Sequence, residues 1–187
     1  MEDLRIKRTH LLLKNALFEL LSQKSFDEIK VNDICNLAMV HRTTFYSHFQ
    51  DKYDLLEYCI QDIKQEATKR ITETKYSNSK EFCTNLVMNL LEYIEESKKM
   101  YQNILNKNSD SRANTVFMNT CIEYITSALE ADQIYKKYNR IDINIMAQFY
   151  SGAVVATIIW WLKSPNPLTK KELCDSIISL IFDKPYK

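Results

Sequence analysis

The chain of 187 residues suits one globular unit, or a small domain joined to a larger one. Apolar residues at 45% allow a sizeable core, whereas one glycine and three prolines are too few for a sheet protein or for a glycine-rich phosphate loop. The net charge of +1 gives no overall sign of nucleic-acid binding, so evidence for that function must come from the local placement of charge.

The five cysteines, Cys35, Cys59, Cys83, Cys121 and Cys174, stand singly along the chain. Their odd number and wide spacing favour a reducing compartment, in which each thiol acts as a small buried apolar group. The N-terminus has no signal-peptide pattern, and the longest apolar run, from Ala153 to Leu162, is far short of the roughly 20 residues that a membrane span needs. We therefore expect a soluble, cytoplasmic protein without a membrane segment.

The first part of the chain has the pattern of three helices followed by a long one. Apolar residues at helical spacing, including Leu13, Ala16 and Leu17, predict the first helix. The predicted helices span about residues 4–22, 32–37 and 42–47, and the long helix runs from a break at 48–52 to about residue 74. Asp51, with Asp54 three residues later, is an acidic variant of a helix N-cap signal.

A polar stretch at residues 75–80 is the best boundary inside the chain. Beyond it, the apolar pattern predicts helices over about residues 80–97, 99–106, 112–131, 141–163 and 169–183. The sequence has no convincing strand-like alternation. It therefore predicts an all-α fold of about nine helices, with a three-helix domain at 1–50, a connecting helix at 51–74 and a C-terminal domain at 75–187.

Residues 29–56 carry the pattern that points to function. Two short helices joined by a three-residue turn and followed at once by a long helix form the skeleton of a helix-turn-helix. Ala38 is small enough for the two helices to cross closely, while Val40, Phe45 and Phe49 are expected to hold the second helix from inside. The predicted DNA-binding residues are the polar remainder: Asn32, His41, Arg42, Thr43, Thr44, Tyr46, Ser47, His48 and Lys52.

Position along the second helix separates the expected roles. Arg42 and Thr43 are near its N-terminus, where side chains reach base edges. Tyr46, His48 and Lys52 come later in the chain and are expected to lie near phosphates of the DNA backbone. The alternative is a solvated helix face with a packed tyrosine and a capping histidine. A metal site is not expected, because no cysteine or paired carboxylate completes a set with the histidines.

The run from Ile29 to Leu56 resembles the DNA-binding signature of TetR-family regulators, in which a T-x-Y or T-F-Y core precedes H-F-x-x-K-x-x-L. Thr44-Phe45-Tyr46, His48-Phe49, Lys52 and Leu55 occupy those places. With the preceding helix, the resemblance covers about the first third of the chain. Two residues depart from the family pattern. Met39 stands where the turn usually has glycine, and a methionine in a left-handed conformation costs roughly 1 kcal/mol. Lys30 stands where threonine often caps the helix.

The resemblance implies a homodimer on a palindromic operator in double-stranded DNA, most often a repressor, with a small-molecule inducer bound among the C-terminal helices. From the aromatic residues we expect that pocket near Tyr93, Phe117 and Phe149, although core packing is the ordinary alternative for them. The expected dimer seam consists of Gly152, Val154, Ile158, Trp161, Leu173, Ile177 and Ile181.

The alternatives to a DNA-binding repressor are an activator, a co-regulator and an enzyme. An activator would use the same scaffold. A co-regulator that acts through a partner protein is kept open by Met39 and by the near-neutral charge of residues 1–52. An enzyme is not favoured, because no nucleophile lies in a glycine-flanked turn and no cofactor motif is present.

Overall fold

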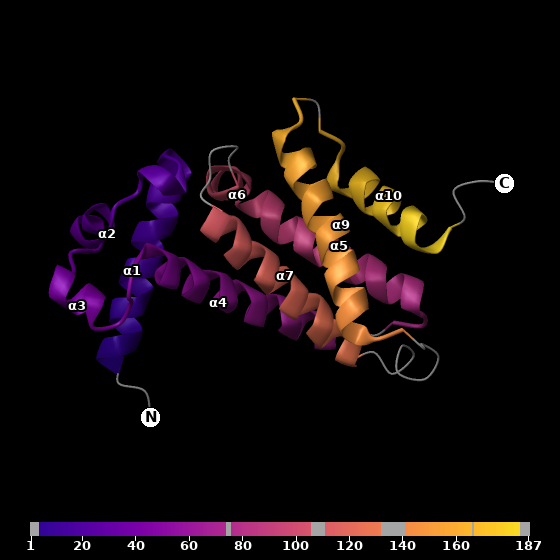
Figure 1. Ribbon diagram of the computed structural model, residues 1–187, viewed down its shortest axis with the longest axis horizontal. Coiled ribbons are helices and arrows are strands. Elements are labelled where there is room, and N and C mark those ends of the chain that lie inside the picture. The colour runs from indigo at the N-terminus through magenta and orange to yellow at the C-terminus, as the bar shows by residue number, and fades with distance from the viewer. Residues whose placement is uncertain (1–3, 74–75, 106–110, 132–140, 166, 184–187) are drawn as a thin grey trace. The chain divides into compact units, whose positions relative to one another are not determined.

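The computed structural model describes residues 4–73, 76–105, 111–131, 141–165 and 167–183 (Figure 1). These residues form α1 (Leu4–Gln23), the 3-10 turn η1 (Phe26–Glu28), α2 (Val31–Ala38), α3 (Arg42–Tyr46), α4 (Lys52–Glu73), α5 (Ser79–Glu96), α6 (Lys98–Ile104), α7 (Ser111–Ala131), α9 (Ile143–Lys163) and α10 (Lys170–Phe182). No strand occurs in these ranges, and the predicted all-α fold is confirmed.

Contacts divide the chain into two compact units. The first comprises Met1–Asp62 and Lys99–Phe117, and the second comprises Ile63–Lys98 and Met118–Lys187. Helices α4 and α7 each continue from one unit into the other. The boundary at 75–80 that the sequence suggests lies within the second unit, partly outside the described residues.

The core of the first unit follows from local patterning. Leu13, Leu17 and Leu21 recur at every fourth position of α1, and all three are fully buried. Helix α2 contacts both α1 and α3. The segment that breaks the helical pattern after α1 forms η1, whose start is capped because the amide and the hydroxyl of Ser25 both donate to the Glu28 carboxylate, at 3.0 and 2.7 Å.

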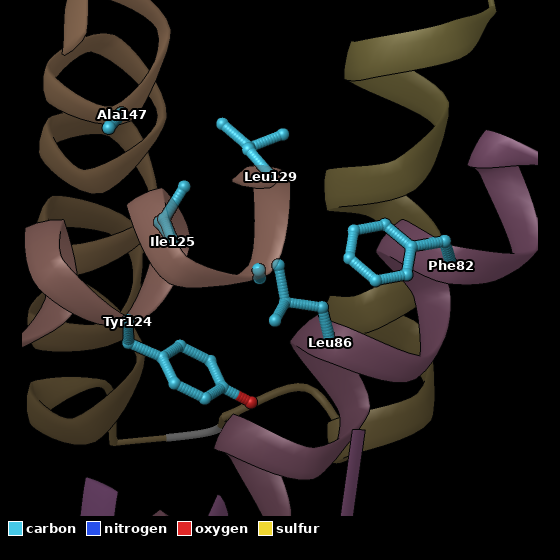
Figure 2. Packing of buried hydrophobic residues seen from close by; sticks show 7 residues of the cluster. Phe82, Leu86, Tyr124, Ile125, Leu129 and Ala147 are labelled. Carbon is cyan, nitrogen blue, oxygen red and sulfur yellow. The ribbon is translucent and has the colours of Figure 1, made fainter. Parts of the chain in front are cut away.

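The second unit is built around a cluster from three helices (Figure 2). Phe82 and Leu86 of α5 pack with four residues of α7, including Tyr124 and Leu129, and with Ala147 of α9. Helix α10 packs against α5. Its start is held by a capping box, in which the Thr169 hydroxyl accepts from the Glu172 amide while the Thr169 amide donates to the Glu172 carboxylate.

Helix α9 is the one described helix that is long and apolar enough to cross a membrane, by length and composition alone. The prediction from sequence rested on the run from Ala153 to Leu162, in which Thr157 is the one polar residue, whereas residues 143–162 contain no charged residue at all. A core helix meets the same criterion, and α9 buries seven of its residues within the chain.

Candidate nucleic-acid interface

The turn between α2 and α3 has the geometry that a helix-turn-helix requires. Met39 follows α2 with φ 53° and ψ 40°, which is the left-handed region, and it alone among the described non-glycine residues has a positive φ. The Met39 amide donates to the Asn36 carbonyl at 3.3 Å, and the Val40 amide donates to the Cys35 carbonyl at 3.0 Å. Methionine thus takes the conformation for which glycine is usually used, and its side chain is 90% exposed.

Replacing Met39 with glycine should raise the free energy of unfolding by about 1 kcal/mol. The substitution removes the steric cost of the left-handed conformation, and the exposed side chain loses almost no packing. Urea denaturation followed by circular dichroism measures the change. Met39→Ala keeps a Cβ at this position and is the matched control, with no comparable gain expected. Equal stability of both variants would contradict the strain argument.

The inner face of α3 is held by two phenylalanines, as predicted. Phe45 and Phe49 are 0% and 4% exposed, and their ring centroids are 5.8 Å apart. Ala38, at the crossing of α2 and α3, is also buried. Since these residues leave α3 little freedom to rotate, the orientation of its outer side chains is set by the core.

The outer side chains of α3 are polar and exposed. Six of the nine predicted DNA-binding residues are exposed: Asn32, His41, Arg42, Thr43, Tyr46 and Ser47. The Arg42 guanidinium carbon lies 5.9 Å from the centroid of the Tyr46 ring, which is 50% exposed. Thr44 is partly buried. This surface combines donors, acceptors and one positive charge, which suits base edges and phosphates.

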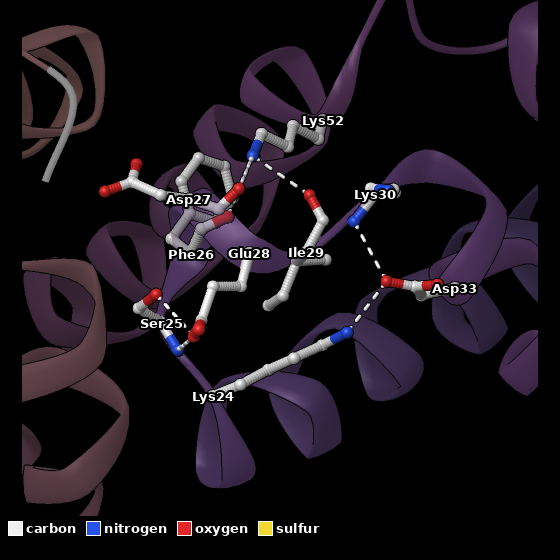
Figure 3. Close-up of polar contacts among 9 residues, drawn as sticks. All are labelled: Lys24, Ser25, Phe26, Asp27, Glu28, Ile29, Lys30, Asp33 and Lys52. Carbon is white, nitrogen blue, oxygen red and sulfur yellow. Dashed lines mark hydrogen bonds and ion pairs between the residues drawn. The ribbon is translucent and has the colours of Figure 1, made fainter.

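Lys52 has a different environment from the one expected. Its Nζ donates to the carbonyl oxygens of Phe26, Asp27 and Ile29 at 2.8, 3.2 and 2.9 Å (Figure 3). An ammonium group has three protons to donate, and these contacts account for all of them. Lys52 therefore ties the first turn of α4 to η1. These carbonyl oxygens compete with the phosphate contact that the sequence predicts for Lys52.

Replacing Lys52 with methionine should lower the free energy of unfolding by about 1–3 kcal/mol, because two part-buried carbonyl contacts and one exposed one lose a charged donor. Denaturation in urea measures this loss. Lys99→Met, at an exposed position of α6, is the matched control and should change little. An unchanged stability together with a shallower salt dependence of DNA binding, by about one unit of slope per lost phosphate contact, would restore the phosphate role.

His48 packs against α1. Its ring lies edge-on to that of His10, with centroids 5.0 Å apart, and His10 also contacts Phe49 and Tyr58, each at 4.9 Å. The His10–His48 contact brings the first turns of α1 close to the end of α3. Arg5, Lys7 and Arg8 in those turns are exposed. These three cations are not among the DNA-binding residues predicted from the sequence. The signal for them is a basic run directly before His10, which contacts His48 just after the end of α3.

Ion pairs reduce the positive charge elsewhere on this unit. The Asp33 carboxylate accepts from the Lys30 amide at 3.1 Å and from Lys24 Nζ at 2.8 Å (Figure 3). The Lys24 ammonium and the Lys30 amide hold the pKa of this carboxyl below its ordinary value. Asp33 at the third position thus closes the start of α2, where Lys30 replaces the usual threonine cap.

The segment Lys99–Phe117 is anchored to the helix ends of the first unit. Asn103 donates to the Leu21 carbonyl at 2.7 Å, near the end of α1. Asp51 accepts from the amides of Tyr53 and Asp54 at 2.8 and 2.9 Å, which confirms the predicted cap of α4, and it pairs with Arg112 of α7 at 2.6 Å. Partial burial alone would raise the pKa of Asp51, but the Asp54 amide and the Arg112 guanidinium bring it below its ordinary value.

The three residues expected to line an inducer pocket differ in their surroundings. Phe149 is 70% exposed on α9. Phe117 belongs to the first unit, where its ring lies 5.9 Å from that of Tyr101, whereas Tyr93 is partly buried in the second. The pocket near these three residues stays a prediction, because aromatic content does not tell which face of a helix a residue occupies.

Most of the expected dimer seam is internal to the chain. Val154, Ile158, Trp161, Leu173 and Ile177 are all buried, with at most 6% of each exposed, so they form core and the expectation is corrected. Gly152 and Ile181 are partly exposed. Exposed apolar residues of α9 form another row, which we call the α9 strip: Ile145, Phe149, Ala153, Ala156 and Trp160. Spacings of three and four residues put its members on one side of the helix.

Comparisons with known proteins cover both ends of the chain. Residues 13–59 match the family model of bacterial regulatory proteins of the tetR family, and residues 81–183 match a transcriptional regulator C-terminal region of the same type. The dhaKLM operon transcriptional activator DhaS of Lactococcus lactis is 28% identical over 97 residues, which are 51% of this chain and 48% of the activator. The chain spans less than half the length of the curated relatives that it matches.

Solved structures share the fold at low identity. A TetR-family regulator from Syntrophomonas wolfei has a TM-score of 0.74 at 17% identity, with 93% of each chain covered. The regulator FadR of Bacillus subtilis, in complex with stearoyl-CoA, has a TM-score of 0.64 at 16% identity, with 93% of this chain and 98% of that chain covered.

Proposed function

Because the chain belongs to the TetR family of helix-turn-helix transcriptional regulators, and so is a DNA-binding protein rather than an enzyme, we propose that it is a ligand-responsive repressor. It acts as a homodimer on a palindromic operator, in the cytoplasm. The observation that carries the proposal is the exposed polar face of α3, with Arg42 at its first turn, held in place by buried Phe45 and Phe49.

Base reading is assigned to Arg42 and Thr43, and backbone contacts to the other exposed residues of the set. A guanidinium donates two hydrogen bonds to the edge of guanine, while a threonine serves either a base or a phosphate. Arg5, Lys7 and Arg8 take the phosphate role expected of Lys52, because they are exposed and precede His10, which contacts the end of the recognition segment.

Dimer formation is assigned to the α9 strip with a second copy of the chain as the partner. Ile145, Phe149 and Trp160 are 65, 70 and 57% exposed, a row of large apolar side chains that a soluble protein seldom leaves in water. Ala153 and Ala156 between them are small enough for a second helix to approach. A two-fold axis would pair the α9 strip of one chain with the α9 strip of the second chain. The two α3 helices of such a dimer would read half-sites about one turn of DNA apart.

A small-molecule inducer would act by binding better to the form of the dimer that does not fit the operator. The stearoyl-CoA complex of the similarly folded FadR supports the binding of a small molecule by this chain. The relationship to the activator DhaS keeps activation as the alternative outcome at the promoter. The co-regulator alternative loses its main support, since Met39 takes the left-handed conformation that the motif needs.

The function is tested by fluorescence anisotropy with duplex DNA from directly upstream of the coding region, beside a scrambled duplex of equal composition. We expect the native duplex to bind at least a thousandfold more tightly than the scrambled one at physiological salt. Equal binding to both duplexes at two salt concentrations would refute sequence-specific regulation at this site.

A further inference from the structure

Tyr124 and Ser151 of the second unit carry buried hydroxyl groups that have no hydrogen-bond partner in the described part of the chain. Tyr124 is 5% exposed and Ser151 is 0% exposed. Neither the Tyr124 phenol oxygen nor Ser151 Oγ has a partner among the described residues. Buried hydroxyls are nearly always paired, because leaving one unpaired loses its hydrogen bond to water without replacement. Both groups therefore call for a partner that the described residues do not supply.

Ser151 differs from the other helical hydroxyls. Thr126 and Ser127 of α7, Thr157 of α9 and Ser176 of α10 each donate to the carbonyl four residues earlier, at 2.7–2.8 Å. This local bond is the ordinary way for a helix to satisfy a hydroxyl. Ser151 does not use it, although it is the most buried of the five.

Both hydroxyls belong to the interior between α5, α7 and α9. Tyr124 extends from α7 toward α5 in the cluster that also contains Ala147 (Figure 2). Ser151 is one turn after Ala147, so the two share the buried face of α9. Tyr93 of α5 and Cys121 of α7 are close enough to Tyr124 to influence its ionisation.

This interior holds no charge. Among the described residues, the only buried polar or charged ones are Thr120 and Ser151. Burial raises the pKa of the Cys121 thiol to about 12 and raises that of the Tyr124 phenol as well, so both groups are neutral at physiological pH. A charged ligand group would lack the partner that a buried charge needs.

We propose that the space between α5, α7 and α9 receives a neutral, mainly apolar molecule whose oxygen is hydrogen-bonded by Tyr124 and Ser151. The site rests on the proposed ligand-responsive function and replaces the pocket expected from the sequence. Alcohols, ketones and esters have the required chemistry, and ionised carboxylates and phosphates do not.

The first test measures the thermal stability of the ligand-free protein. Tyr124→Phe and Ser151→Ala each remove an unpaired hydroxyl, so the Tm should rise by about 2 °C or more. Ser176→Ala is the matched control, because it removes a hydroxyl that has a partner, and its Tm should not rise. An unchanged or lower Tm in both site variants would mean that the hydroxyls are satisfied internally and would overturn the proposal.

The second test uses octan-1-ol and octanoate as probes, since they share a chain length and differ in charge at pH 7. Isothermal titration calorimetry should show octan-1-ol binding to the wild type, weakened about tenfold in each variant by loss of one hydrogen bond. Octanoate should bind much more weakly. The proposal is overturned if octan-1-ol does not bind, if the variants bind it equally well, or if octanoate binds as tightly.

DNA binding by the same samples separates the two hypotheses. Without a probe, the wild type and both variants should bind the upstream duplex equally. Binding of the duplex without any binding of octan-1-ol would refute only the ligand site. Failure of the wild type to distinguish native from scrambled duplex would refute the proposed function.

Discussion

Arg42→Ala is expected to weaken binding to the upstream duplex by about tenfold to a hundredfold per half-site, or about 1–3 kcal/mol. Arg42 opens α3, where an exposed guanidinium reaches base edges, and its contact with the Tyr46 ring restrains it before DNA is bound. Fluorescence anisotropy at two salt concentrations measures the loss. The fold should be unaffected, because the Arg42 side chain is exposed.

Two comparisons show whether Arg42 reads bases or only neutralises phosphates. Arg42→Lys keeps the charge but loses the planar guanidinium group. Compared with Arg42→Ala, it should restore the affinity for scrambled DNA to a larger extent than the affinity for the native duplex. Lys171→Ala removes an exposed charge from α10 and should leave affinity unchanged. An equal loss on native and scrambled duplexes in Arg42→Ala would assign this residue to the backbone and leave specificity to its neighbours.

Phe149→Asp is expected to weaken dimerisation by at least thirtyfold, or about 2 kcal/mol, which is the size of effect typical of an interface hot spot. The two-fold axis places the substitution in the interface twice, and each carboxylate would have to lose its water. Since Phe149 is 70% exposed, the fold of the single chain should persist. Sedimentation equilibrium measures the dissociation constant, and circular dichroism confirms the helices.

The control for this experiment is Asn119→Asp, which adds the same charge at an exposed position of α7 outside the α9 strip. It should remain dimeric. A Phe149→Asp variant that dimerises as well as the wild type would remove the α9 strip from the interface. A wild type that is monomeric at micromolar concentration would refute the dimer itself.

Much of the first unit could be predicted because its information is local. Spacing along α1 and α3 shows which side chains are buried, so Leu13, Phe45 and Phe49 were identified as core and Arg42 as exposed. The helix-turn-helix also occupies one short stretch of chain, with a turn whose backbone geometry depends on neighbouring residues. Periodicity and a short motif are sufficient to predict the buried positions and the turn of such a segment.

The contacts of Lys52 could not be predicted from neighbouring residues in the sequence. The motif placed this residue next to DNA, but the carbonyl groups that receive its protons belong to residues 26, 27 and 29. Asn103 and Arg112 make long-range contacts of the same kind within the first unit. Such pairs join positions 23 to 82 residues apart, and only folding determines that they meet.

The C-terminal helices set a different limit. Helix α9 is apolar around its circumference, so the spacing of its residues does not say which side enters the core. Its sequence established a helix of about the observed length. The packing of the second unit then buried Val154, Ile158 and Trp161 and left Ile145, Phe149 and Trp160 exposed. The amino-acid pattern thus determined the helices and the exposed polar face of α3. Tertiary packing alone decided which apolar surface stays exposed and which hydroxyls of the described residues stay unpaired, because only neighbouring helices distinguish two equally apolar sides.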